Sequence, residues 1–485
     1  MLTNFPPQGP FIDTLRLKTL NVKGEFFFSD ADVREIQPLA NDDLELSYRV
    51  WMQEKPAPLV FVIPGLGGHN AGETQTALAE LIFNSGFSVA MFTSPFNWDF
   101  LLNASTAVTP GYTPYDSADA YNVIKFALAD LYDEYGTNSI TDKILVGYSL
   151  GALESIFIAK YDSIKKEIGF ERYVALSPPV NLLYAMKQLD SLYSVWTNWS
   201  DAKILTNTVK VTKYYKKISA RGLASDELLK LSEIDAKYTI GIVYRRVLTE
   251  TLKALLSIKN YDFIKNPYGF KKNILGKELE RYSYFNYLKT FFKSEHPELF
   301  TNNFTLRTLN ANASMPALQS FLLSSTNIYV FESANDFLLS DYDLKWLAKV
   351  MKNNITFFDR GGHLGYFCNS IFQTNFIRAL NGSPIKNDVS DVFPVRAETT
   401  NLTFKINLVS RKANATEQTV TNITELVTKE IKVDVDKLGT NNSVNLPPAS
   451  TATIIRVTIN PHSEDKPQKK ETSEQDGIIL ETIEE

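Results

Sequence analysis

The chain has 485 residues, of which 44% are hydrophobic and 22% charged, and its formal net charge is −5 at pH 7. This length suits two or three domains with a large core, and the composition is typical of a soluble globular protein. The negative balance, without a basic stripe, argues against a nucleic-acid partner. The single cysteine, Cys368, excludes an intrachain disulfide and a cysteine-based metal site, and we expect no bound metal.

The first 57 residues form a lead-in with strands. They begin with MLTNFPPQGPF, which has neither the basic nor the apolar region of a signal peptide. Residues 44–51 alternate imperfectly between apolar and polar, as in an edge antiparallel strand. No apolar run along the chain reaches the length of a membrane span. The compartment stays open between the cytoplasm and the cell envelope, where a signal peptide would have been removed.

Residues 58–180 alternate between strand-like and helix-like segments. Helical patterns occupy about 74–84 and 116–135, and strand-like segments occupy 59–63, 87–92, 144–146 and 171–177. Strands alternating with helices predict a parallel sheet that is covered by helices on both faces. The same pattern resumes in 325–382, with strands at 327–331 and 355–358 and helices at 340–351 and before Leu380. These two stretches are predicted to form one α/β core.

The stretch between them, 181–324, is rich in helix formers and aromatic residues, including Trp196, Trp199, Tyr214, Tyr215 and the cluster at 282–287. We interpret it as a helical cap inserted into the core. The alternative is a plain helical domain. Most of its aromatic residues are expected to form its own core, with a few lining a substrate pocket.

The C-terminal part has a different pattern. Residues 383–461 contain three stretches of alternating apolar residues, which predict a small β domain or extension. This unit is a candidate for docking on a surface or a protein partner. Residues 462–485 are charged and poor in apolar side chains, so a disordered tail is expected.

A G-x-S-x-G motif lies at 147–151, between the strand at 144–146 and a helical pattern. Glycine on both sides allows a turn too tight for most side chains, which projects Ser149 at the carboxyl end of the strand. A helix N-terminus beside the serine directs backbone N–H groups toward it. The pattern therefore favours Ser149 as a nucleophile over an ordinary loop serine.

An activated serine needs a base, and the base needs an orienting carboxylate. His363 follows a strand in a glycine-flanked loop, which favours it as the base over a surface-loop histidine. The other three histidines are His69, in a glycine-rich loop, His296, in the insertion, and His462, in the tail.

Asp336 is the predicted carboxylate because it lies just past the 327–331 strand. Glu332 directly follows the predicted strand, which is slightly too early in the chain for this role. Asp341 and Asp343 are better explained as charges in the first turn of a helix.

Nucleophile, acid and histidine in this chain order resemble an α/β-hydrolase. The resemblance rests on PLVFVIPGLGG, ILVGYSLGA, ESANDFLLS and DRGGHLGYF, spread over about 58–180 and 325–380. It is greatest to the esterase and lipase group that includes monoacylglycerol lipases and is also labelled serine aminopeptidase (S33-type). Three features depart from the family pattern: Pro64-Gly65 replaces His-Gly, Phe337 replaces a proline after the acid, and TSPFNWDF replaces a glycine-rich loop.

The resemblance implies a mostly parallel sheet with helices on both faces and hydrolysis of a small or lipid-like carboxylic ester. Ser149, Asp336 and His363 would form the triad, the backbone N–H groups of Leu66 and Leu150 the oxyanion hole, and no cofactor would be needed. His69 and Tyr148 are candidate pocket residues. Three alternatives stay open: acyl transfer to another acceptor, amide cleavage, and a non-catalytic binding protein with this fold.

Overall fold

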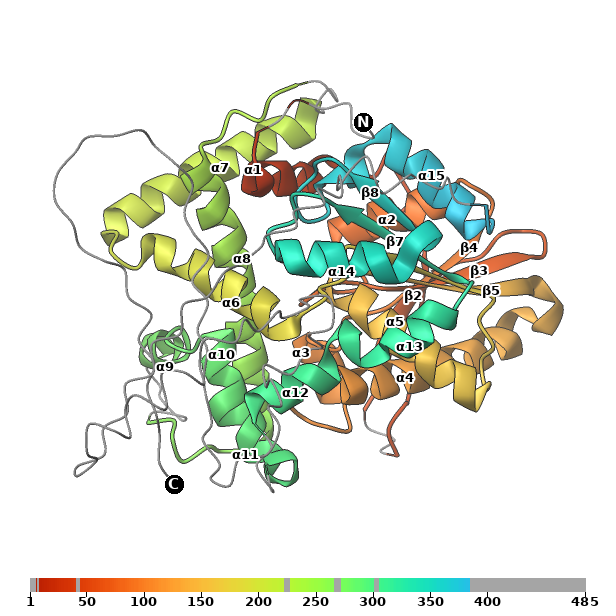
Figure 1. Cartoon of the computed structure of the whole chain (residues 1–485), viewed down its shortest axis with the longest axis horizontal. Coiled ribbons are helices and arrows are strands. Elements are labelled where there is room, and N and C mark those ends of the chain that lie inside the picture. Colours follow the sequence, from red (N-terminus) through yellow and green to blue (C-terminus); the bar gives the residue numbers. More distant parts are fainter. Residues whose placement is uncertain are drawn as a thin grey trace, which may run out of the picture. The chain divides into compact units, whose positions relative to one another are not determined.

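The computed structural model describes residues 6, 8–40, 44–221, 227–265, 272–300 and 305–383. The predicted β unit at 383–461, except for its first residue, and the tail at 462–485 lie outside this part of the chain. The centre of the fold is an eight-stranded sheet in the order β1-β2-β4-β3-β5-β6-β7-β8 (Figure 1). Its strands are β1 (Asp32–Ile36), β2 (Leu46–Trp51), β3 (Ala57–Ile63), β4 (Ser88–Met91), β5 (Ile140–Tyr148), β6 (Arg172–Leu176), β7 (Ile328–Ser333) and β8 (Ile355–Phe358).

From β3 to β8 the strands are parallel, whereas β1 and β2 are antiparallel to their neighbours. The strand predicted at 44–51 was expected at an edge, and this is wrong, because β2 lies between β1 and β4. The edge position belongs to β1, in which Arg34 lies on the same face as the buried Ile36 and has its Nε 2.6 Å from Oδ2 of Asp130. The imperfect alternation of β2 reflects its burial between two strands.

Helices cover both faces of the sheet, as predicted. On one face lie α2 (Glu73–Phe83) and α15 (Ser370–Leu380), and on the other lie α4 (Thr113–Tyr135), α5 (Leu150–Lys165) and α14 (Asp341–Met351) (Figure 1). Successive side chains of β3 alternate between the two cores, because side chains on a strand point to opposite faces. This strand order and layering are those of the α/β-hydrolase fold, so the predicted fold class is confirmed.

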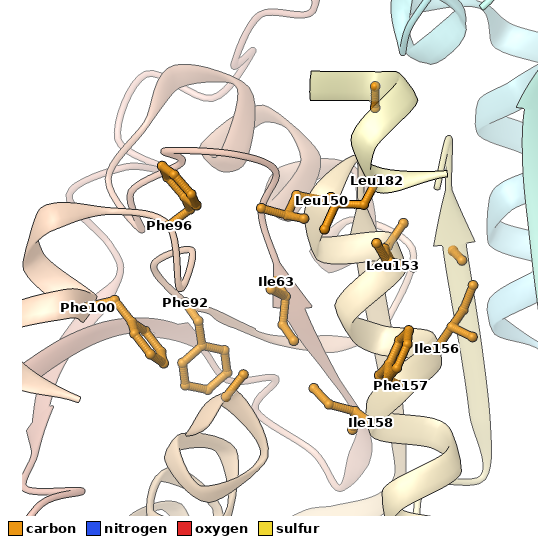
Figure 2. Close-up of a cluster of buried hydrophobic side chains, with 14 of the residues drawn as sticks. Ile63, Phe92, Phe96, Phe100, Leu150, Leu153, Ile156, Phe157, Ile158 and Leu182 are labelled. Atoms are coloured by element: carbon orange, nitrogen blue, oxygen red, sulfur yellow. The ribbon is translucent and has the colours of Figure 1, made fainter. Parts of the chain in front are cut away.

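The first turns of α5 belong to the larger of the two cores. Figure 2 shows Leu153, Ile156 and Phe157 along α5, with Ile63 and Phe92 at the ends of the neighbouring strands. All of these side chains are at least nine-tenths buried. Burying a side chain of this size stabilises the fold by about 1.5–3 kcal/mol. This packing fixes the N-terminus of α5 against the carboxyl edge of the sheet.

Between β6 and β7 the described residues form helices and turns. The longer helices are α6 (Leu182–Tyr193), α7 (Asp201–Arg221), α8 (Glu233–Ile258), α9 (Lys272–Leu279), α12 (Leu306–Ala313) and α13 (Gln319–Ser324); the shorter are α10 (Tyr284–Tyr287), α11 (Lys293–Glu295), η3 (Ser194–Trp196), η4 (Leu288–Phe292), η5 (Pro297–Phe300) and η6 (Met315–Leu318). Several aromatic side chains of this insertion are buried. Trp196 packs against Tyr238 within the insertion, whereas the rings of Tyr284 and Tyr287 also contact Phe96, which lies outside it.

The sequence did not predict the helices of the N-terminal segment, α1 (Pro10–Leu15) and η1 (Arg16–Thr19). They lie between α8 and the turn η8 (Gly365–Cys368). Three further short helices are α3 (Trp98–Asn103), η2 (Thr137–Ser139) and η7 (Lys352–Asn354). Among the described residues, we find no helix that combines the length and the apolar character needed to cross a membrane.

Candidate active site

Ser149 lies in a sharp turn between β5 and α5, with φ of +55°. The turn depends on two glycines. A Cβ atom on Gly147 would lie 2.0 Å from the carbonyl oxygen of Gly151, and one on Gly151 would lie 2.3 Å from that of Ile63. The Ser149 N–H donates a hydrogen bond to the carbonyl of Leu176, which ties the turn to the end of β6. The serine is therefore held at the carboxyl edge of the sheet.

His363 lies in the loop after β8, and its Nε2 is 2.7 Å from Oγ of Ser149. Its backbone N–H donates to Oγ1 of Thr14 in α1. Gly362, with φ of +53°, lies so close to α1 that a Cβ there would be 2.1 Å from the carbonyl oxygen of Pro10. The imidazole is 1% exposed. The N-terminal segment therefore supports the loop that carries this histidine.

Asp336 follows β7, and its Oδ2 is 2.7 Å from Nδ1 of His363. Its Oδ1 accepts a hydrogen bond from the N–H of Leu338 at 2.8 Å. A carboxylate at Nδ1 requires the proton on that nitrogen, which leaves Nε2 free to accept the proton of Ser149. The structure thus brings together three predicted residues from three separate loops in one chain of hydrogen bonds.

The loop after β3 lies directly beside Ser149. A Cβ on Gly65 would be 2.8 Å from Cβ of Ser149. The Gly68 N–H donates to the carbonyl of Gly65, and Gly67 has φ of +73°, as the third position of a type II turn requires. The N–H of Leu66, at the second position, takes no part in this turn bond. Leu150 begins α5, so its N–H is one of the first-turn donors that have no acceptor within the helix.

The two candidate pocket residues differ in their burial. His69 is 38% exposed, and its Nε2 is 3.6 Å from Oδ2 of Asp99. Tyr148 is buried on the α2 and α15 side of the sheet, where its ring packs edge-on against Phe367. Burial raises the pKa of its hydroxyl above the usual range, and the phenol interacts with Gly65 and Gln75. Of the remaining histidines, His296 packs on Phe292 within the insertion, and His462 lies outside the described residues.

Helix α8 of the insertion lies over the site. A Cβ on Gly67 would be 2.5 Å from both methyl groups of Val247, so α8 packs against the loop beside Ser149. The pKa of the Tyr244 phenol is raised to about 12 by burial and then by the charge of Asp336. Ser149 itself is 6% exposed. The insertion and the sheet therefore enclose the three residues together.

A second buried carboxyl group, Glu332, lies beside Asp336. Its Oε1 accepts hydrogen bonds from the Ser333 N–H at 2.7 Å and from Oγ of Ser177 at 3.2 Å. The sequence did mark Glu332 as a carboxylate near the strand end, but only as a weaker candidate for the acid. Its contact with Ser177, 155 residues away, has no sequence signal.

No protein-family model matches this chain, and no curated protein does. Among solved structures, it is similar to an esterase of Pyrococcus furiosus at 12% identity and a TM-score of 0.39, covering 78% of this chain and 99% of that one. Brefeldin A esterase, a bacterial homologue of human hormone-sensitive lipase, is similar at 11% identity and a TM-score of 0.39, over 78% and 88% of the two chains. A thermostable carboxyl esterase of Bacillus coagulans follows at 14% identity and a TM-score of 0.35, over 73% and 98%.

These similarities are too distant to assign a family. The α/β-hydrolase fold rests on the strand order and on the helices that cover the sheet, which are observed in the protein itself.

Proposed function

We propose that this protein is a serine hydrolase that cleaves carboxylic esters through an acyl-enzyme. The observation that carries the proposal is the continuous hydrogen-bonded chain from Ser149 through His363 to Asp336. A serine with a histidine at its hydroxyl and a carboxylate behind that histidine is the arrangement that activates a nucleophile in unrelated folds.

The reaction begins when Nε2 of His363 takes the proton of Ser149 and Oγ attacks the ester carbonyl. Asp336 keeps the imidazole in the required tautomer and stabilises the imidazolium that forms. The imidazolium then gives its proton to the leaving alcohol. Water, activated by His363, hydrolyses the acyl-enzyme and restores the serine. The same steps with another acceptor in place of water would give acyl transfer.

The oxyanion of the tetrahedral intermediate accepts hydrogen bonds from the N–H groups of Leu66 and Leu150. Both residues border Ser149, one in the adjoining loop and one at the start of α5. Losing one donor of this kind in other serine hydrolases lowers kcat by about 10²–10³.

The insertion at 181–324 acts as a cap. With Ser149 and His363 almost fully buried, a substrate reaches the serine when α8 moves away from the loop at Gly67. Closure of α8 over the bound ester removes water from the site and strengthens the hydrogen bonds to the developing oxyanion.

The test is labelling with a fluorophosphonate probe, followed by assays with p-nitrophenyl esters of increasing chain length. Ser149→Ala should abolish labelling. Asp336→Asn should keep the fold and lower kcat by about 10⁴, because it favours the wrong histidine tautomer. Ser155→Ala, a change at a buried serine on α5 that lies outside the triad, is the matched control.

A folded wild-type protein that does not react, even after detergent or lipid has been added to open the cap, would contradict the proposal. That result would favour a non-catalytic binding protein. Labelling that survives in Ser149→Ala would place the nucleophile elsewhere.

A further inference from the structure

Glu332, the last residue but one of strand β7, is fully buried, and so are Ser177 and Tyr366 around it. The phenol oxygen of Tyr366 is 2.9 Å from Oγ of Ser177 and 3.2 Å from the carbonyl oxygen of Phe331. Ser177 in turn reaches Oε1 of Glu332. A buried polar network of this kind has to satisfy each of its donors and acceptors, because an unpaired polar group in a dry interior is costly.

The directions of these hydrogen bonds determine where a proton resides. The Ser177 hydroxyl and the Ser333 N–H both donate to Oε1 of Glu332. Oε2 is buried and accepts no hydrogen bond from the described residues. The Glu332 carboxyl also interacts with the side chain of Asp336, and two carboxyl groups can share a hydrogen bond only when one of them carries a proton.

Asp336 is the poorer choice for that proton. Its two oxygens already accept N–H donors, Oδ1 from Leu338 and Oδ2 from His363. N–H donors stabilise the ionised form of a carboxyl group. Glu332 has such donors on one oxygen only, so the proton belongs on its Oε2.

We infer that Glu332 is a positioning residue that stays a neutral carboxylic acid and donates a hydrogen bond from Oε2 to the carboxylate of Asp336. The inference rests on the proposed function, since it concerns the same triad. Glu332 has no hydrogen bond to Ser149 or to the imidazole, and it acts through Asp336. It holds the Asp336 carboxylate in place and reduces the affinity of that carboxylate for the proton of His363. The base consequently loses its proton, and becomes active, at a lower pH.

The surroundings agree with a neutral Glu332. Burial raises the pKa of this carboxyl well above its ordinary value and the charge of Asp336 raises it further, while the donors from Ser333 and Ser177 act in the opposite direction. The other titratable groups around the two carboxyls are His363, Tyr366 of η8 and Tyr244 of α8. Neither tyrosine is charged at neutral pH, because burial raises the pKa of both phenols.

Two variants separate a neutral Glu332 from a charged one. Glu332→Gln keeps an uncharged donor and an acceptor in the same places, whereas Glu332→Met keeps the volume and removes both. The readout is the pKa of His363. It is measured by NMR titration of protein that contains ¹⁵N-labelled histidine, and the His363 signals are assigned by comparison with His363→Asn. This titration does not require turnover, so it reports on Glu332 even if the ester hydrolase proposal fails in the labelling test.

We expect Glu332→Gln to leave the His363 pKa close to that of the wild type and Glu332→Met to raise it by about one pH unit, because Asp336 loses a donor. If the protein hydrolyses esters, the acid limb of its pH profile of kcat/KM should shift together with the His363 pKa. The infrared carbonyl band of a protonated carboxyl group should decrease in Glu332→Gln. Glu154→Gln is the matched control, since Glu154 is a second buried glutamic acid away from the triad and should lose its own band without moving His363.

Three results would overturn the inference. If the infrared spectrum of Glu332→Gln is the same as that of the wild type, Glu332 is ionised. If the His363 pKa is lower in Glu332→Gln than in the wild type, a negative charge on Glu332 acts on the imidazole. An unchanged His363 pKa in folded Glu332→Met would also contradict it. If Glu332→Met does not fold, the two measurements on Glu332→Gln still decide the matter.

Discussion

Two serines at the carboxyl ends of neighbouring strands have backbone conformations that L-residues rarely adopt. Ser149 has φ of +55° after β5, and Ser177 has φ of +50° after β6. Strain of this kind costs about 1–3 kcal/mol for each residue and persists only where the surroundings impose it. At Ser149 it presents the hydroxyl to His363, and at Ser177 the hydroxyl bonds Glu332. In both cases the strain is located where a side chain takes part in the polar network of the site.

Glu154, on α5, is a second residue whose protonation can be tested, in this case through the stability of the fold. The residue is fully buried, and both of its carboxyl oxygens lack a hydrogen-bond partner. Burial, and then the charge of Asp116, raises the pKa of this carboxyl well above 4.5. At a pH above 4.5, Glu154 therefore keeps a proton in the folded state that it loses in the unfolded state. This difference in proton binding lowers the free energy of unfolding as the pH rises.

Replacing Glu154 by Gln removes this proton linkage. The free energy of unfolding of Glu154→Gln, relative to the wild type, should increase between about pH 5 and pH 8, by up to about 1.4 kcal/mol per pH unit. Urea unfolding at several pH values measures it. A difference that stays constant with pH would show that Glu154 is ionised in the folded protein.

At the scale of elements, the N-terminal helix α1 supports the histidine loop. Oγ1 of Thr14 accepts the His363 N–H at 2.8 Å and donates to the carbonyl of Pro10 at 2.6 Å. Asn335 joins the same region, donating to Oδ2 of Asp13 and accepting from the Gly362 N–H. The loops carrying the acid and the base are thus both bonded to a segment that precedes the sheet in the sequence.

Thr14→Val tests this support. The substitution leaves the buried His363 N–H without a partner, which should lower the free energy of unfolding by about 1–3 kcal/mol. A shift of the loop should also lower kcat, since misplacing a catalytic group by about 1 Å reduces the rate by up to about 10². Urea unfolding and ester kinetics measure the two effects. Thr14→Ser, which keeps the hydroxyl, is the control. If Thr14→Val and Thr14→Ser behave alike, the Thr14 hydroxyl does not support the histidine loop.

At the scale of the whole molecule, the described residues all belong to the first of the two units into which the chain divides, Met1–Arg396. The eight strands and the Ser149, Asp336 and His363 cluster are complete within it. Nothing in the proposed mechanism draws on the second unit, Ala397–Glu485.

A chain ending at Arg396 should therefore keep its fluorophosphonate labelling and its activity on small esters within about twofold of the full chain. Circular dichroism and the probe assay on both proteins check this expectation, with Ser149→Ala in each length as the control. Loss of labelling in a folded short chain would show that the second unit contributes to the site. Retained labelling would leave docking as the candidate role of the β unit predicted at 383–461.

Much of the core could be predicted because its signals are local. Apolar runs marked β3, β5 and β7, a serine cap marked the start of α14, and glycines at fixed spacing marked the turn at Ser149. The alternation of strands and helices also placed Ser149 and the loop at 64–69 past the carboxyl ends of the strands, where the ligand site of a parallel sheet lies. By itself, the sequence determined the fold class and the three candidate triad residues.

Only the tertiary structure decided the contacts that link distant segments. These are the inner position of β2, the packing of Val247 on Gly67, the bond from His363 to Thr14 across 349 residues, and the network around Glu332. None has a periodicity or a motif, because each depends on how separate elements approach one another rather than on the preference of a single stretch. Long-range packing therefore supplies the environment that sets proton affinities and access at the site.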